Sequence, residues 1–130
     1  MEKLIVKNPG CGPIVQEVEK IDLDLLQSKV KGNIASPLIP TLAETGVTLF
    51  ANDEGLLARM SPNVTYSIAG HNELIVGPVV FVGTDGEGET VGLTDVQVEV
   101  VRTFIEWSDN NIMTTLGSDS YRYLGGFYGA

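Results

Sequence analysis

The alternation of hydrophobic and polar positions changes period several times along this chain, and the clearest block covers residues 75–97. Within it, residues 76–82 form an apolar run that is too short for a typical helix, with β-branched or aromatic side chains at Val76 and at positions 79–82. This run predicts a largely buried strand, with Pro78 near its beginning, where a missing backbone N–H is tolerated. Residues 83–89 then alternate glycine with acidic or polar side chains, which predicts a hairpin turn or a wide loop.

A helix is predicted to follow this turn. The Thr94 hydroxyl can cap its first turn, and Gln97 completes a T-x-x-Q capping box. Apolar side chains then recur at helical spacing at Val96, Val100, Phe104 and Trp107. We predict a helix over residues 94–108 that ends in the polar run 108–111. Its aromatic side chains favour a place in the core, with a homodimer surface as the alternative.

The first third of the chain predicts a hairpin and a short helix. Residues 3–7 and 13–18 are strand-like and flank a turn-rich loop, so they predict an antiparallel pair. Asp22 can cap a helix in which Leu23, Leu26 and Val30 recur at helical spacing, and Gly32 is placed to end it.

The middle of the chain is divided by turns. Residues 33–41 predict a short strand and then an irregular segment, because Pro37 and Pro40 interrupt an apolar stretch. Residues 47–51 predict a clear strand. The neighbouring predictions are a turn at 52–55, an extended segment or partial helix at 56–60, a strand or loop at 66–69 and a turn at 70–73.

These elements indicate one domain of the α+β class. Strands flank the helices and do not alternate strictly with them, which favours α+β over a doubly wound α/β fold. A length of 130 residues with 43% hydrophobic content suffices for one core. We therefore predict a single globular domain over residues 1–110, with a mostly antiparallel sheet and two or three helices. The Gly-, Ser- and Tyr-rich tail, residues 111–130, carries aromatic side chains that favour docking on the domain.

The charge of the chain is negative and uneven. The formal net charge is −9, and residues 51–107 hold nine acidic side chains against Arg59 and Arg102, which amounts to −7. Nucleic-acid binding relies on clustered Lys and Arg, so we expect no direct binding to DNA or RNA. An acidic surface can attract a basic protein or mimic nucleic acid, although it more often serves solubility.

Cysteine content and hydropathy indicate the compartment. Cys11 is the only cysteine, so no intramolecular disulfide forms. The first residues lack a secretory apolar region, and no apolar run approaches the roughly 20 residues that span a bilayer. We therefore expect a cytoplasmic protein without membrane association. In that setting the glycosylation sequon that begins at Asn63 is interpreted as a chance match.

Two short motifs resemble the Domain of Unknown Function 3846 family. They are N-D-E-G-L at residues 52–56, and V-G-T-D-G-E-G-E followed by L-T-D within residues 82–95. The resemblance covers roughly residues 1–107 and implies a small protein of bacteriophages, plasmids and the bacteria that carry them, without an established activity. The chain departs from the family pattern at residues 58–64, where many members resemble G-L-P-x-N-R. Arg59 is displaced from that basic position, so a ligand role of the family residue does not transfer to it directly.

Candidate chemical sites are incomplete. Asp85, Glu87 and Glu89 form an oxygen-rich turn, but the D-x-[DN]-x-[DN]-G spacing of a calcium loop is missing, and a solvated hairpin is the simpler interpretation. His71 is the sole histidine, and its pairing with Cys11 specifies no geometry for a thiol dyad. The G-C-G sequence around Cys11 lacks the further glycine and the lysine of a phosphate loop. We predict no catalytic residue, no metal and no cofactor.

Two classes of function remain open. We favour a non-enzymatic protein-interaction module of phage or mobile-element origin, acting in the bacterial cytoplasm on a protein partner or as a homo-oligomer. The aromatic tail and the acidic middle are its candidate surfaces, the latter formed by Asp85, Glu87, Glu89, Asp53, Glu54 and Arg59. The alternative is a small-ligand or nucleotide-derivative sequestering protein, or an unrecognised enzyme, with a pocket built from glycine turns and Arg59 or Arg102.

Overall fold

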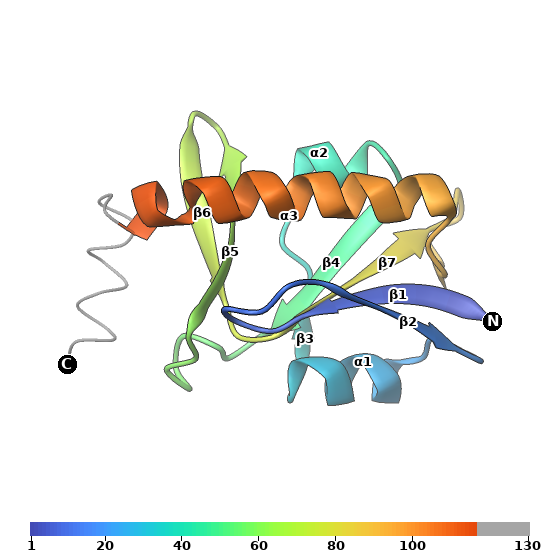
Figure 1. Cartoon of the computed structure of the whole chain (residues 1–130). Coiled ribbons are helices and arrows are strands. Elements are labelled where there is room, and N and C mark those ends of the chain that lie inside the picture. The colour runs from blue at the N-terminus through green and yellow to red at the C-terminus, as the bar shows by residue number, and fades with distance from the viewer. Residues whose placement is uncertain (117–130) are drawn as a thin grey trace.

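The computed structural model describes residues 1–116, which form an α+β fold (Figure 1), as predicted. In chain order the elements are β1 (Glu2–Lys7), β2 (Ile14–Val18), α1 (Leu23–Val30), β3 (Ile34–Ala35), α2 (Pro40–Ala43), β4 (Val47–Asn52), β5 (Pro62–Ile68), β6 (His71–Val76), β7 (Val79–Thr84), β8 (Thr90–Val91) and α3 (Asp95–Leu116). No helix in this part of the chain is both long enough and apolar enough to cross a membrane.

The main sheet has the strand order β2-β1-β7-β4-β3, and β8 also pairs with β7. All of its strand pairs are antiparallel. β7 lies at the centre, where Phe81 pairs with Ile5 of β1 and with Leu49 of β4. β5 and β6 form a second, two-stranded antiparallel sheet. The prediction of a mostly antiparallel sheet is confirmed.

Helices cover both faces of the main sheet (Figure 1), with α3 on one side and α1 on the other. Phe81 of β7 belongs to a core cluster with Val101 of α3, whereas its neighbour Val80 belongs to a cluster with Leu26 of α1. Successive side chains of a strand point to opposite faces. β7 is therefore apolar at consecutive positions because both of its faces are covered, which confirms the predicted burial.

The predicted hairpins are present, but two strand boundaries were predicted wrongly. Residues 76–82 do not form one strand: β6 ends at Val76 and β7 begins at Val79. Between them Gly77 has a φ of 81°, and Pro78 has no N–H for a ladder bond, so the chain turns there from the second sheet into the first. The predicted turn at 70–73 is also shorter, because His71 already belongs to β6.

The short helices follow their capping signals in part. The Asp22 carboxylate accepts a hydrogen bond from the Leu25 N–H at 2.9 Å, which confirms the predicted cap of α1. The left-handed residue that ends α1 is Lys31, with a φ of 64°, and not Gly32 as expected. α2 begins inside the segment predicted to be irregular, because Pro40 suits the first turn of a helix. Residues 53–59 form turns, so neither the extended segment nor the partial helix predicted at residues 56–60 is present.

α3 has the predicted start and a later end than predicted. The Gln97 N–H donates to the Thr94 hydroxyl at 3.1 Å, and the Thr94 N–H donates to the Gln97 side chain at 3.0 Å, so the capping box is confirmed. The helix continues through Ser108 to Leu116, and the predicted end at residue 108 is wrong. Residues 111–116 thus belong to the helix. Residues 117–130, the rest of the predicted docked tail, lie outside the described residues.

Candidate functional site

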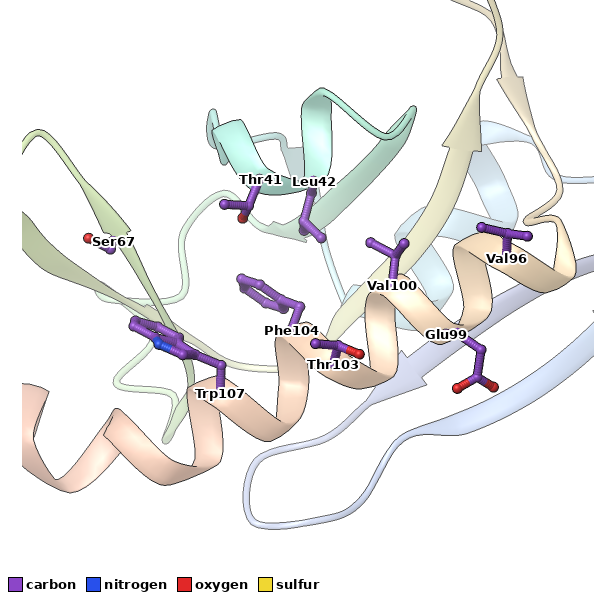
Figure 2. Close-up of a pocket in the computed structure, with 9 residues that line it drawn as sticks. All are labelled: Thr41, Leu42, Ser67, Val96, Glu99, Val100, Thr103, Phe104 and Trp107. Carbon is purple, nitrogen blue, oxygen red and sulfur yellow. The ribbon is translucent and has the colours of Figure 1, made fainter.

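An open groove of about 750 Å³ runs along α3, between α2 and the β5–β6 sheet (Figure 2). Its lining residues are Thr41, Leu42, Ser67, Val96, Glu99, Val100, Thr103, Phe104 and Trp107. α3 supplies the floor, α2 forms one wall and Ser67 of β5 lies beside the Trp107 end. The groove therefore joins segments that are far apart in the sequence.

α3 can line this groove because it carries apolar side chains on two faces. One face, which includes Val98, Val101 and Ile105, is buried against the main sheet. The second face follows the spacing that the sequence suggested, but Val96 is 74% exposed and Trp107 is 38% exposed. The prediction that the aromatic side chains of this stripe lie in the core was therefore wrong for Trp107, which is partly open to solvent, as is Val96.

Phe104 connects the groove to the core. Its ring contacts the Phe81 ring edge to face, with ring centroids 6.0 Å apart, and its side chain is only 8% exposed. Such aromatic pairs have a defined geometry that restrains both rings. The floor of the groove is therefore fixed by the central strand of the main sheet.

Buried hydrogen bonds attach the β5–β6 sheet to α3. The Thr65 N–H donates to the Ser108 hydroxyl at 2.9 Å, and the Thr65 and Thr115 hydroxyl oxygens are 2.9 Å apart. Asn72 also donates to the Thr115 hydroxyl, at 3.3 Å. Thr65, Ser108 and Thr115 are nearly inaccessible to solvent, so these bonds lie in a low-dielectric environment that strengthens them. This network explains why α3 continues beyond residue 108.

The other wall is attached through Gln97. Its side-chain amide donates to the Thr45 carbonyl at 3.0 Å and to the Gly46 carbonyl at 3.1 Å, in the loop that follows α2. The same side chain completes the capping box of α3. Both walls are thus bonded to the helix that forms the floor, and the groove is preformed, as binding sites usually are.

The solvent side of α3 next to the groove is acidic. Glu99 lies on the rim, and Glu106 is exposed two helical turns further on. The Arg102 Nε is 3.8 Å from a Glu99 carboxylate oxygen, but both side chains are more than half exposed, so this contact is weak. An apolar floor with an acidic rim suits a ligand that combines apolar and basic groups.

A second cavity, of about 450 Å³, lies beside the buried Lys7 side chain. The Lys7 ammonium donates to the Asn63 side-chain oxygen at 2.8 Å and lies 3.9 Å from the Asp109 carboxylate. Burial lowers the pKa of Lys7 from its ordinary value, against an opposing effect of Asp109. The Asn63 amide in turn donates to the Lys7 and Gly77 carbonyls at 2.8 and 2.7 Å. This cluster joins β1, β5 and the β6–β7 turn. The side chain of the sequon residue Asn63 is therefore fully engaged in the interior.

The acidic residues singled out from the sequence lie at two ends of the main sheet. Asp85 follows β7, and its carboxylate accepts hydrogen bonds from the Glu87 and Glu89 N–H groups at 2.9 Å each, so it holds the turn together. Asp53, Glu54 and Arg59 follow β4.

Strand pairing keeps these two groups apart. β4 and β7 are antiparallel, with Val47 opposite Gly83 and Ala51 opposite Val79, so the ends from which the two groups emerge are opposite. The groups are separated by about 20 Å along the strands, and the structure does not bring them together. Among the described residues, no three His, Cys, Asp or Glu side chains are placed to hold a metal ion. His71 pairs with Glu73 of its own strand at 2.7 Å.

The groove was only partly visible in the sequence. The apolar spacing of Val96 and Val100 was noted, and it is the signal that a second face of the helix is apolar. Thr41, Leu42 and Ser67 were missed, because their places in the groove depend on contacts between distant segments.

Comparisons with known proteins give one match. The family described as a domain of unknown function (DUF3846) matches residues 1–106, which include every groove residue except Trp107. Searches of curated proteins and of solved structures found no match.

Proposed function

We propose that this chain, which belongs to the domain of unknown function DUF3846 family, is a non-enzymatic protein-interaction module. Its α3 groove is proposed to bind an apolar segment of a partner protein that is flanked by Lys or Arg. The observation that carries this proposal is a preformed groove of about 750 Å³ in which Val96 and Trp107 remain exposed.

The dimensions of the groove suit a short peptide segment. Val96 and Trp107 are separated by about 16 Å along the helix axis. About five extended residues or three turns of a helix cover such a length. Grooves on helical surfaces commonly take one amphipathic segment, and aromatic side chains such as that of Trp107 commonly act as anchors in interfaces.

The charge of the chain supports a basic partner. Glu99 and Glu106 flank the groove, and the whole chain carries a formal net charge of −9. The acidic turns at Asp53 and Asp85 are proposed to add to the field that steers such a partner toward the protein. The same field repels phosphate backbones, so we propose no direct nucleic-acid binding.

The groove lining supports binding over catalysis. Glu99 is the one titratable side chain among its lining residues, and most of the other lining side chains are apolar. A small apolar ligand is the second candidate, because the volume of the groove lies within the usual range of small-molecule sites. A nucleotide derivative is less suited, since its phosphate groups would face Glu99.

The proposed setting is the cytoplasm of a bacterium that carries a phage or another mobile element. The sequence motifs shared with the family support this origin. The single, exposed Cys11 is compatible with a reducing compartment.

A peptide selection with matched variants tests the proposal. The full chain is used to select binders from a phage-displayed random peptide library, and the dissociation constant of the best peptide is read from Trp107 fluorescence, since Trp107 is the only tryptophan. Val96→Glu should weaken binding at least tenfold, because the partner would bury a carboxylate. Met113→Glu is the control, because Met113 is 75% exposed on the same helix outside the groove. Equal affinities of both variants would refute the proposal.

A further inference from the structure

We infer that residues 121–128 of this same chain are an intramolecular occupant of the α3 groove and compete there with the partner. This inference rests on the proposed function of the groove and adds its regulation. The segment reads Y-R-Y-L-G-G-F-Y, so it presents aromatic and aliphatic side chains around a single basic residue, Arg122. That composition is the ligand chemistry that the groove and its acidic rim favour.

The place where α3 ends puts this segment within reach of the groove. From Leu116, the last residue of α3, Trp107 lies about 14 Å back along the helix axis and Val96 about 30 Å back. An extended chain advances about 3.3 Å per residue. If the reversal after Leu116 uses about two residues, the chain comes level with Trp107 near residue 122 and level with Val96 near residue 127. Residues 121–128 therefore cover the length of the groove with the reversal included.

Opposite charges favour this alignment of residues 121–128 along α3. With Arg122 level with Trp107, its side chain comes within reach of Glu106, and Glu99 lies further along the same side of α3. Opposite charges on the two sides of an interface fix its register more than they add to its affinity.

Because the segment is covalently attached to α3, even a weak affinity is sufficient for it to occupy the groove. A segment tethered by a short connection experiences an effective concentration of about a millimolar. A dissociation constant of the same order, about 1 mM for the free segment, would therefore close the groove in about half of the molecules. A partner must then displace the segment, and its apparent affinity falls by the fraction of molecules that are open.

The test uses the full chain and its only tryptophan. In one variant Tyr121, Tyr123, Phe127 and Tyr128 are replaced by Ser, and in the control variant Ser118 and Ser120 are replaced by Ala. Trp107 emission and its quenching by acrylamide are measured, together with the affinity for the library-selected peptide. The aromatic variant should shift Trp107 emission to longer wavelength and increase quenching. It should also tighten peptide binding, by about twofold if half of the molecules are closed. The control should match the wild type.

Four outcomes separate the inference from the function on which it rests. Unchanged Trp107 emission and an unchanged peptide affinity in the aromatic variant overturn the inference and leave the groove function intact. A shift of Trp107 with tighter peptide binding supports both. If no peptide binds either chain, the groove function and the competition both fail. If Trp107 emission depends on protein concentration and the tail substitutions abolish that dependence, a second copy supplies the occupant, which overturns the intramolecular form.

Discussion

The Asn63 side chain connects β1, β5 and the β6–β7 turn through hydrogen bonds. Its replacement by leucine measures how much these bonds contribute to the free energy of unfolding. Leucine has the same number of side-chain heavy atoms and the same branching at Cγ, so Asn63→Leu removes the bonds without opening a large cavity. The change leaves the Lys7 and Gly77 carbonyls and the Lys7 ammonium without the amide that they contact now. Asn63 is 2% exposed, so water cannot readily take its place.

The expected loss follows from these contacts. An unsatisfied buried polar group costs about 1–3 kcal/mol, and a bond to a charged group lies toward the upper end, so the three lost bonds amount to about 4–6 kcal/mol. Burial of the leucine side chain returns about 2 kcal/mol. The net loss is about 2–4 kcal/mol, which corresponds to a fall in Tm of about 8–16 °C for a domain of this size.

Urea denaturation at constant pH measures this loss as a lower midpoint with an unchanged slope. Asn110→Leu is the matched control, because Asn110 is exposed on α3 and should change stability by less than about 0.5 kcal/mol. If Asn63→Leu unfolds within that same margin of the wild type, the Asn63 cluster does not stabilise the junction of β1, β5 and the β6–β7 turn as we describe.

Three further predictions concern other contacts of the fold. Ser108→Ala should lower the free energy of unfolding by about 1–3 kcal/mol, although alanine favours helices, because the Thr65 N–H loses its acceptor; equal or higher stability in urea would contradict this. Burial lowers the pKa of Lys7 below the 10.5 of an ordinary lysine, so between the two values the unfolded chain binds more protons and stability should rise with pH. In the same urea series, the free energy of unfolding of Lys7→Met should rise less with pH than that of the wild type. Equal slopes of stability against pH would contradict the lowered pKa of Lys7. Asp85→Ala should cost about 1 kcal/mol, because the two N–H groups that it accepts from are exposed, and should leave peptide affinity unchanged; a tenfold loss of affinity would place the binding surface at this turn.

Local signals were sufficient for the elements whose determinants lie within a few residues. Thr94 and Gln97 form the capping box that their spacing predicted, and Asp22 caps α1. The apolar residues of β7 were correctly interpreted as a buried strand. A run of consecutive apolar residues is enough to indicate a strand that is covered on both faces. Such signals can be recognised without knowing the tertiary contacts of the element.

The wrong predictions share a non-local cause. The polar run 108–111 was interpreted as the end of the helix, but the Ser108 hydroxyl accepts a hydrogen bond from the Thr65 N–H of a distant strand. The division between β6 and β7 depends on the left-handed Gly77, and glycine permits that conformation without requiring it. In both places tertiary contacts decided between alternatives that local sequence leaves open.

The groove shows the same division. The second apolar face of α3 was present in the spacing of Val96, Val100 and Trp107. Its exposure became evident only when the packing of Val98 and Val101 identified the face that meets the main sheet. The acidic residues were identified in the sequence as a charge feature, but the antiparallel register of β4 and β7 separates them.

Chemical-shift mapping of the full chain with the selected peptide tests the groove most directly. In spectra of the isotope-labelled protein, we expect the largest changes to cluster on both walls and the floor, at Thr41, Leu42, Val96, Thr103 and Trp107. Residues of the two acidic turns should change little. Changes concentrated at Asp85 or at Asp53, with the groove residues unaffected, would contradict binding in the groove and locate partner binding on the acidic ends of the main sheet.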